Sequence, residues 1–210
     1  MTNILEILQR ERVVVVIRGA AAATLGQELC ALYEGGLRIF EVTVEASGAV
    51  NALASVREQL PQDALLGAGT VLDAGTASLV VAAGARFVVS PIILKEVCQV
   101  TRARGVPCIL GGSTPTEIHA AYRCGSEVVK VFPASTVGPG FLRELKGPLG
   151  FIPLYPTGGI TLENARTFLD AGAVALGVGS ALVKKEWVER GDWNALRREA
   201  SAWAAFRQAG

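Results

Sequence analysis

Histidine is nearly absent from this chain of 210 residues, which has only His119, and none of its four cysteines stand in a C-x-x-C spacing. A transition-metal site built from imidazole or thiolate ligands is therefore not expected. His119 is interpreted as a surface or helix-packing residue. The cysteines are interpreted as reduced thiols scattered through the core; they are Cys30, Cys98, Cys108 and Cys124.

Charge of one sign and long apolar runs are also lacking. The net charge is +1, which gives no reason to expect nucleic acid or an anionic membrane as a partner. No apolar run reaches the roughly 18 residues that span a bilayer. The first twelve residues have neither the basic start nor the cleavage site of a signal peptide, so we expect a cytoplasmic protein. With 50% apolar and 19% charged residues, the chain is predicted to form one globular domain, 1–210.

Glycine is abundant, and it recurs where a helical pattern ends and an apolar run begins. Glycine just past a helix end supplies the left-handed cap that stops the helix. The spacing corresponds to about 23 residues per unit, which is what a strand, a helix and two short loops need. Thr114-Pro115-Thr116-Glu117 has the pattern of a helix start with a capping box. The predicted helix-end glycines are Gly36, Gly84, Gly105, Gly125 and Gly172.

Strict alternation of strands and helices favours an α/β fold, most simply a single (β/α)8 TIM barrel. A doubly wound open sheet is the structural alternative. In a barrel, catalytic residues lie at the carboxyl ends of the strands, so polar residues there are the candidates for chemistry. The eight predicted strands are 13–18, 39–44, 65–70, 87–91, 106–111, 127–133, 151–157 and 173–179.

Lys130 interrupts the sixth apolar run, where an unpaired ammonium loses several kcal/mol of hydration. Pairing the amine or lowering its pKa reduces that cost, and a lysine with a lowered pKa is a nucleophile that forms Schiff bases. Because side chains alternate along a strand, Val129 and Val131 are expected to face the helices while Lys130 points inward. Glu41 points inward from the second strand by the same argument. Glu41 is either the counter-ion of Lys130 or a group that also carries protons.

Arg18 ends the first strand, where a guanidinium suits the carboxylate of an α-keto acid. Thr70 follows the glycine-rich end of the third strand and brings a hydroxyl to the same mouth. Two further glycine loops end strands seven and eight. Backbone N–H groups in such loops bind anions, and barrels commonly hold a phosphate there. The residues of these two loops are Thr157, Gly158 and Gly159, and Gly177, Gly179 and Ser180.

Six segments together resemble the 2-keto-3-deoxy-6-phosphogluconate (KDPG) and 4-hydroxy-2-oxoglutarate (KHG) aldolase family. They run in the family's order through most of the chain. The similar segments are Phe40-Glu41-Val42-Thr43, Gly67-Ala68-Gly69-Thr70-Val71, Val89-Ser90-Pro91, Lys130-Val131-Phe132-Pro133-Ala134, Pro156-Thr157-Gly158-Gly159-Ile160 and Gly177-Val178-Gly179-Ser180.

The resemblance implies a class I aldolase on a (β/α)8 barrel, without a cofactor and usually trimeric. Lys130 would form the Schiff base and Glu41 would be the acid/base. The products would be pyruvate and either glyceraldehyde 3-phosphate, as in Entner-Doudoroff metabolism, or glyoxylate. Thr70 and Pro91 match positions lining the pyruvate end. The pocket for the distal phosphate is matched by Thr157, Gly158, Gly159, Gly179 and Ser180.

One position departs from the resemblance. Some family members have arginine where this chain has Glu45, and there it contacts the substrate carboxylate, which a glutamate would repel. We therefore assign the carboxylate to Arg18. Two other functions use the same glycine loops: a phosphate-binding barrel isomerase or synthase, which has no need of Lys130, and a non-catalytic phosphosugar-binding protein, in which Lys130 and Glu41 form a structural ion pair.

Overall fold

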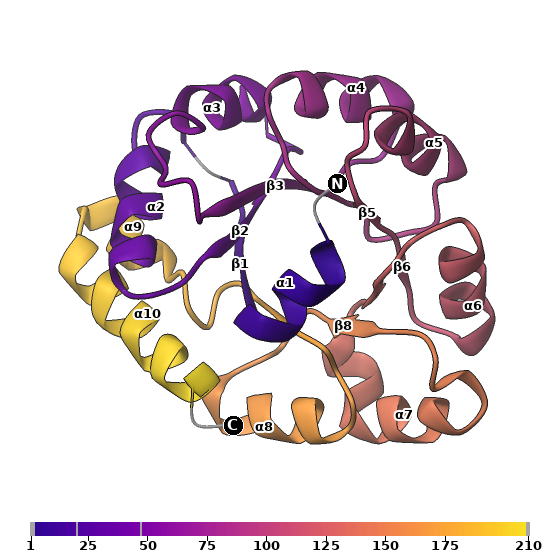
Figure 1. The fold of residues 1–210 in the computed structure, drawn as a ribbon. Helices are drawn as coiled ribbons and strands as arrows, with labels where there is room; N and C mark the ends of the chain where they lie inside the picture. Colours follow the sequence, from indigo (N-terminus) through magenta and orange to yellow (C-terminus); the bar gives the residue numbers. More distant parts are fainter. Residues whose placement is uncertain (1–2, 20, 47, 209–210) are drawn as a thin grey trace.

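The computed structural model describes residues 3–19, 21–46 and 48–208, drawn in Figure 1. Strands and helices alternate along this part of the chain, and the strand ladders are parallel. The predicted α/β class is therefore confirmed. The strands are β1 (Val13–Ile17), β2 (Ile39–Thr43), β3 (Leu65–Gly69), β4 (Val88–Val89), β5 (Cys108–Ile109), β6 (Gly111–Gly112), β7 (Val129–Val131), β8 (Leu154–Pro156) and β9 (Leu176–Val178).

Most helices surround the strands, whereas the first one lies across the middle of the ring that they form (Figure 1). The helices are α1 (Ile4–Glu11), α2 (Leu25–Glu34), α3 (Ala49–Val56), α4 (Ala74–Ala82), α5 (Lys95–Ala103), α6 (Pro115–Arg123), α7 (Ala134–Leu149), α8 (Leu162–Asp170), α9 (Lys185–Arg190) and α10 (Trp193–Gln208).

The strands are connected in two ladders. One has the order β5-β4-β3-β2-β1-β9 and the other the order β6-β7-β8. The predicted fifth strand is divided into β5 and β6 at Leu110, and β8 meets β9 only through isolated bridges from Leu154 to Ala173 and from Thr157 to Gly177. The strands thus form a curled parallel sheet rather than one continuous closed ladder. Their order follows the chain without the reversal of a doubly wound sheet, so that alternative is wrong.

Alternation along the strands divides the core into two layers. Val42, Val129 and Val131 belong to the large cluster between the strands and the outer helices. A smaller cluster inside the curled sheet contains Ile4 and Leu8 of α1 together with residues such as Val14, Ile39 and Leu65. Helix α1 thereby covers the interior at the amino ends of the strands, since Val14, Ile39 and Leu65 lie near the starts of β1, β2 and β3. The predicted inward direction of Glu41 and Lys130 follows from the same alternation.

The predicted helix ends agree with the backbone. Gly36, Gly84, Gly105, Gly125 and Gly172 all have positive φ angles, as left-handed caps require. At the start of α6, the side chains of Thr114 and Glu117 form the reciprocal bonds of the predicted capping box.

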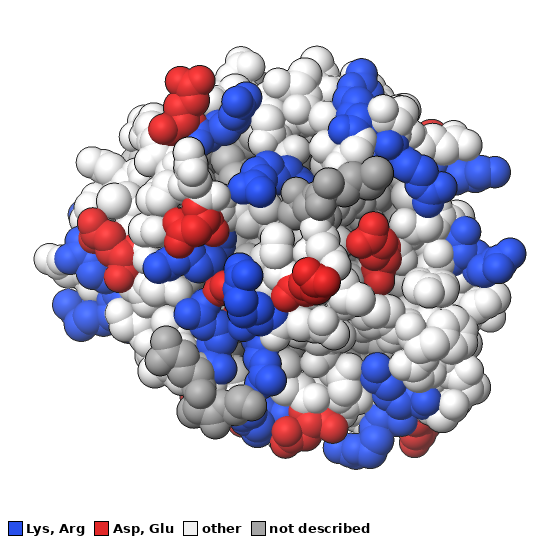
Figure 2. Space-filling view, viewed as in Figure 1, with Lys and Arg blue, Asp and Glu red and all other residues white. Residues whose placement is uncertain are grey.

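The surface carries charges of both signs. In Figure 2, basic and acidic side chains are interspersed over the face that bears α1, in keeping with the net charge of +1. Within the described ranges, no helix is both long and apolar enough to span a bilayer.

Candidate active site

Lys130 of β7 and Glu41 of β2 form an ion pair inside the curled sheet. The Lys130 Nζ lies 3.0 Å from Glu41 Oε1, and the side chains are 4% and 0% exposed. The two strands are not neighbours in either ladder, so only the curling of the sheet brings these residues together. The predicted pairing is present, and its low exposure means that bulk water solvates neither charge.

Glycine at position 69 makes room for this pair. A Cβ atom there would lie 2.3 Å from Glu41 Oε1, closer than nonbonded atoms approach. Gly69 faces the interior from β3, beside Glu41 and Thr43 of β2. The glycine-rich end of β3 therefore has a steric purpose that the sequence pattern leaves open, namely access for the carboxylate.

Tyr155 of β8 completes the environment of Glu41. Its hydroxyl donates a hydrogen bond of 3.0 Å to Glu41 Oε2. Burial, and next the negative charge of Glu41, raise the pKa of Tyr155 well above its ordinary value, so the phenol stays protonated. Sequence reasoning missed this residue because an aromatic side chain in an apolar strand is typical of the core. Tyr155 and Thr157 are two residues apart on one strand and therefore face the same side of the sheet, which was the one indication in the sequence that Tyr155 points inward.

The loop after β8 begins next to this group. Thr157 is buried, and its hydroxyl group lies beside the Tyr155 hydroxyl. Gly158 and Gly159 follow with φ angles of 99° and 73°, a turn that residues with a Cβ atom rarely make. A Cβ atom at Gly177 would lie 2.2 Å from the Thr157 Oγ1, so glycine is needed on β9 as well.

Arg18, Gly179 and Ser180 line one cavity of about 620 Å³ at the mouth of the sheet. Val16 also lines it, and Val16 is the residue paired with Glu41 in the β1–β2 ladder. The lining of this cavity comes from β1, α2, α9 and the turn after β9, and it does not include Lys130 or Glu41. The structure brings Arg18 together with one of the two predicted anion loops, and its guanidinium carbon lies 6.0 Å from the centre of the Phe132 ring.

No helix starts directly after the second glycine loop. Residues 180–183 form a turn, in which the amides of Leu182 and Val183 bond to the carbonyl of Gly179, and α9 begins only at Lys185. The loop after β8, by contrast, does lead into a capped helix, α8. Any anion bound at Gly179 and Ser180 would therefore rely on the amides of a turn.

Glu28 of α2 lines the same cavity and is 2% exposed. Burial raises the pKa of its carboxyl group to about 7. Glu28 was not among the residues predicted from the sequence, because it stands between leucines on a helix. The cavity therefore combines the basic Arg18 and Lys185 with a carboxyl group that is partly protonated near neutral pH.

The remaining predicted residues lie at the carboxyl ends of their strands. Thr70 follows β3 with a positive φ of 58°, uncommon for a residue with a Cβ atom. Pro91 follows β4, and its carbonyl oxygen approaches Gly111 so closely that a Cβ atom there would lie 2.3 Å away. Glu45 is exposed and lies near β2, where its Oε1 accepts a hydrogen bond of 3.0 Å from the Thr43 hydroxyl. This carboxylate at the mouth would repel an anion placed against it.

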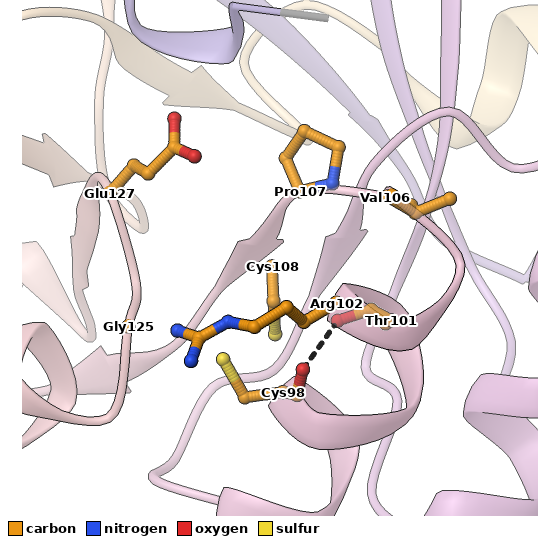
Figure 3. Close-up of a pocket in the computed structure, with 9 residues that line it drawn as sticks. Cys98, Thr101, Arg102, Val106, Pro107, Cys108, Gly125 and Glu127 are labelled. Atoms are coloured by element: carbon orange, nitrogen blue, oxygen red, sulfur yellow. Dashed lines mark hydrogen bonds between the residues drawn. The ribbon is translucent and has the colours of Figure 1, made fainter. Parts of the chain in front are cut away.

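A second cavity, of about 80 Å³, lies at the opposite ends of the strands (Figure 3). Its lining includes Pro107 and Glu127, which precede β5 and β7, and the thiols of Cys98 and Cys108. All four cysteines are free, as predicted. A hydrogen bond from Cys108 and the nearby Arg102 guanidinium lower the pKa of Cys98 to about 7. These two thiols are therefore adjacent rather than scattered, but they lie away from Lys130.

No three histidine, cysteine, aspartate or glutamate side chains come close enough to hold a metal ion among the residues that the structure describes. The polar groups inside the curled sheet include an amine, a carboxylate and two hydroxyl groups, from Lys130, Glu41, Tyr155 and Thr157. Such a set can form an imine with a carbonyl compound and transfer protons around it.

Comparison with known proteins points to the same chemistry. The family model for KDPG and KHG aldolase matches residues 4–199. A 2-dehydro-3-deoxy-phosphogluconate aldolase of Treponema pallidum is 38% identical over 198 residues, 92% of each chain, and its counterpart in Dickeya dadantii is 38% identical over 83% of each chain. A crystal structure of KDPG aldolase from Legionella pneumophila, with pyruvate captured as a covalent carbinolamine, has a TM-score of 0.89 and 29% identity over 96% of this chain and 98% of that one.

Proposed function

The chain belongs to the KDPG and KHG aldolase family, and on that premise we propose that Lys130 is the amine that binds the substrate. The protein is a class I aldolase that cleaves 2-keto-3-deoxy-6-phosphogluconate to pyruvate and glyceraldehyde 3-phosphate. The unphosphorylated 4-hydroxy-2-oxoglutarate, which gives pyruvate and glyoxylate, is proposed as a further substrate. The observation that carries the assignment is the 3.0 Å contact between the Lys130 Nζ and the Glu41 carboxylate in a buried interior.

Each chemical step needs a proton moved, and Glu41 is the carboxylate within reach of the amine. Glu41 accepts a proton from the Lys130 ammonium, and the free amine attacks the ketone carbon to form a carbinolamine. Glu41 returns the proton to the carbinolamine hydroxyl, which leaves as water and gives a protonated imine. It then takes the proton of the C4 hydroxyl while the C3–C4 bond breaks and the electron pair moves into the imine. Protonation of the resulting enamine and hydrolysis release pyruvate.

Reduction with borohydride in the presence of pyruvate tests the role of Lys130. The expected product is a stable pyruvate adduct on the peptide that contains Lys130, identified by mass spectrometry. Lys130→Ala should form no adduct and lose turnover, with circular dichroism as the check that it folds. A wild-type protein that gives no adduct but binds phosphosugars would instead support the non-catalytic alternative. Phosphosugar turnover without any adduct would support the isomerase or synthase.

The loops after β8 and β9 support a phosphorylated substrate. Thr157, Gly158, Gly159, Gly179 and Ser180 are proposed to hold the distal phosphate through backbone amides and hydroxyl groups. Thr70 and Pro91 are proposed to line the pyruvate end. Turnover of 2-keto-3-deoxy-6-phosphogluconate and 4-hydroxy-2-oxoglutarate, measured side by side, tests this preference. A higher kcat/KM for the unphosphorylated substrate would contradict it.

Arg18 is proposed to bind the carboxylate of the keto acid, because Glu45 cannot. Arg18→Ala should then raise the pyruvate concentration needed for half-maximal borohydride trapping. Since Arg18 lines the same cavity as Gly179 and Ser180, a second outcome is informative. If the variant traps pyruvate normally but has a raised KM for the phosphorylated substrate only, Arg18 binds the phosphate and the carboxylate assignment is wrong.

The family resemblance further supports three proposals about the whole molecule. We propose that the two ladders together constitute a (β/α)8 barrel, with residues 1–210 forming one catalytic domain. We propose a homotrimer as the assembly and the cytoplasm as the location. Sedimentation of the purified protein tests the homotrimer, and fractionation of the source cells tests the cytoplasmic location.

A further inference from the structure

The two oxygens of the Glu41 carboxylate have different partners. Oε1 lies 3.0 Å from the Lys130 Nζ, and Oε2 accepts the hydrogen bond from the Tyr155 hydroxyl, also at 3.0 Å. The carboxylate is fully buried, so bulk water does not compete for either oxygen. Tyr155 therefore fixes which oxygen of Glu41 is presented to the amine.

We propose that Tyr155 is a positioning residue of the aldolase reaction, which holds Glu41 in its ionised form with Oε1 directed at the nitrogen of Lys130. The inference rests on the proposed function and deepens it. A hydrogen bond donated to a carboxylate favours the charged form over the neutral acid. Without it, the Glu41 carboxylate would lose this stabilisation and could rotate away from the amine.

Tyr155 is suited to donate and not to exchange its proton. The phenol is 1% exposed, and its pKa lies well above the ordinary value because of burial and the adjacent carboxylate. It stays protonated throughout the pH range in which an aldolase would work. Glu41 remains the group that moves protons, while Tyr155 determines where the carboxylate lies.

The residues around Tyr155 leave room for its hydroxyl group and pack against its ring. A Cβ atom on Gly177 would lie 2.8 Å from the Tyr155 hydroxyl oxygen, so glycine on β9 is required beside it. The ring of Tyr155 packs in the inner apolar cluster with Leu65 and Ile109, among others. Phenylalanine would keep these ring contacts, so Tyr155→Phe removes only the hydroxyl group, with its hydrogen bond to Glu41 and its contact with Thr157.

Among the residues that the structure describes, few charged groups face this carboxylate. Lys130 on β7 contacts it directly, and Tyr155 on β8 is its other partner. Farther out at the mouth lie Arg18 after β1 and Glu45 after β2, where Glu45 contacts the Thr43 hydroxyl. Neither is altered by Tyr155→Phe. A change in the pH dependence of that variant would therefore report on the Glu41–Lys130 pair.

The first test is the pH profile of kcat/KM for aldol cleavage by wild type and Tyr155→Phe. The acid limb of the profile should move to higher pH, and kcat should fall about 10- to 100-fold, since hydrogen bonds to charged groups contribute that much. The KM should change little. An unmoved acid limb with an unchanged kcat would show that Tyr155 is only a packing residue.

Tyr33→Phe is the matched control. Tyr33 also donates a hydrogen bond to a carboxylate, at 2.8 Å to Asp63 Oδ1, but on the surface of the protein. The chemical change is the same, yet the pH profile should match that of wild type. An equal shift in this variant would contradict a role specific to Tyr155.

A second measurement separates this inference from the proposed function. The carboxyl carbon of Glu41 can be followed by NMR in protein labelled with carbon-13 glutamate, with Glu41→Gln giving the assignment. Its titration midpoint should rise in Tyr155→Phe and stay fixed in Tyr33→Phe. If wild type fails to trap pyruvate, the proposed function fails, while this titration still decides whether Tyr155 holds the carboxylate in its ionised form.

Discussion

The Lys130 ammonium and the Glu41 carboxylate are both removed from water, so each charge is stabilised mainly by the opposite charge beside it. The side chains are 4% and 0% exposed. Removing one member of such a pair costs about 3–5 kcal/mol, because it leaves an uncompensated charge, whereas replacing both is often neutral. Lys130→Met should therefore lower the free energy of unfolding by about that amount. Adding Glu41→Gln should restore most of the loss, as measured by urea unfolding.

The double variant is the decisive member of that series. The amide introduced by Glu41→Gln retains an oxygen that can accept the Tyr155 hydrogen bond but carries no charge. If the single and the double variant are equally destabilised, the ion pair is not the source of the loss. Neither variant should trap pyruvate, since both lack the amine.

Glu28 gives a prediction about pH. Burial raises the pKa of its carboxyl group from 4.5 to about 7 in the folded protein. Between these values the folded state binds more protons than the unfolded state, so its contribution to stability declines as pH rises through that range. Glu28→Gln removes the titration and should be more stable than wild type at pH 8, by at most about 3 kcal/mol.

Thermal unfolding at several pH values checks this expectation. The difference between Glu28→Gln and wild type should be small at pH 4.5 and should grow up to about pH 7. A difference that is constant with pH would mean that Glu28 is ionised in the folded protein. Glu45→Gln, at an exposed position at the same mouth, is the matched control and should change stability little.

Residues whose chemistry conflicts with their neighbours were predictable from the sequence. Lys130 stands out in an apolar run, and Glu41 follows from the alternation of side chains along its strand. Tyr155 was not predictable, because an aromatic ring is typical of a buried strand and the sequence does not show that its hydroxyl group bonds to Glu41. Glu28 was missed because a helix of this amphipathic type tolerates polar residues at its margin. Burial, which the sequence does not show, turned it into a titrating group.

At the scale of elements, α1 shows that an amphipathic sequence pattern predicts a helix but not where that helix packs. Its amphipathic character was evident in the sequence, but its place across the amino ends of the strands depends on contacts with distant residues (Figure 1). Strand positions agreed with the predicted ranges, whereas their lengths did not, since β4 and β5 have two residues each. The short ladders reflect a strongly curled sheet, which the alternation of apolar residues does not encode.

Leu8 tests whether α1 is a structural cover. Its side chain is 0% exposed and packs in the inner cluster. Leu8→Ala should lower the free energy of unfolding by about 2–5 kcal/mol, the usual loss for a buried leucine. The exposed neighbour Gln9 provides the control, because Gln9→Ala should leave stability nearly unchanged. Chemical denaturation measures both.

Activity measurements on the same variants test whether the site at the carboxyl ends of the strands is independent of α1 at their amino ends. Lys130 and the glycine loops lie toward the carboxyl ends of the strands, and α1 covers the amino ends. The KM and kcat of Leu8→Ala should therefore match those of wild type at a temperature where the variant is folded. A changed KM would show that α1 influences the site through the packed interior.

For the whole molecule, the repeated βα unit was predictable because glycine caps recur at even spacing, and all five have the positive φ angles that caps need. The division of the sheet was not, since it depends on the junction between β5 and β6 at Leu110 and on the isolated bridges that alone join β8 to β9. Pairing between the last strands and the first is a long-range property. The local pattern of residues carries no information about it.

The proposed trimer gives the last prediction. Four large apolar side chains are notably exposed in the described part of the chain: Leu72 at 49%, Leu79 at 60%, Ile92 at 52% and Phe151 at 59%. The first three belong to one stretch of sequence, 72–92, that includes α4, and we propose this stretch as the interface because exposed apolar surface marks association sites. A carboxylate buried in such an interface costs several kcal/mol. Leu79→Glu combined with Ile92→Glu should therefore sediment as a monomer where wild type sediments as a trimer.

Phe151→Glu serves as the control because Phe151 is as exposed as Leu79 but follows α7, where its ring contacts Tyr122. It should leave sedimentation unchanged. If the double variant also remains a trimer, this stretch is not the interface. If wild type itself sediments as a monomer, the proposed assembly fails, and the exposed residues near α4 need another explanation. A monomer that keeps full turnover would further mean that each chain holds a complete site.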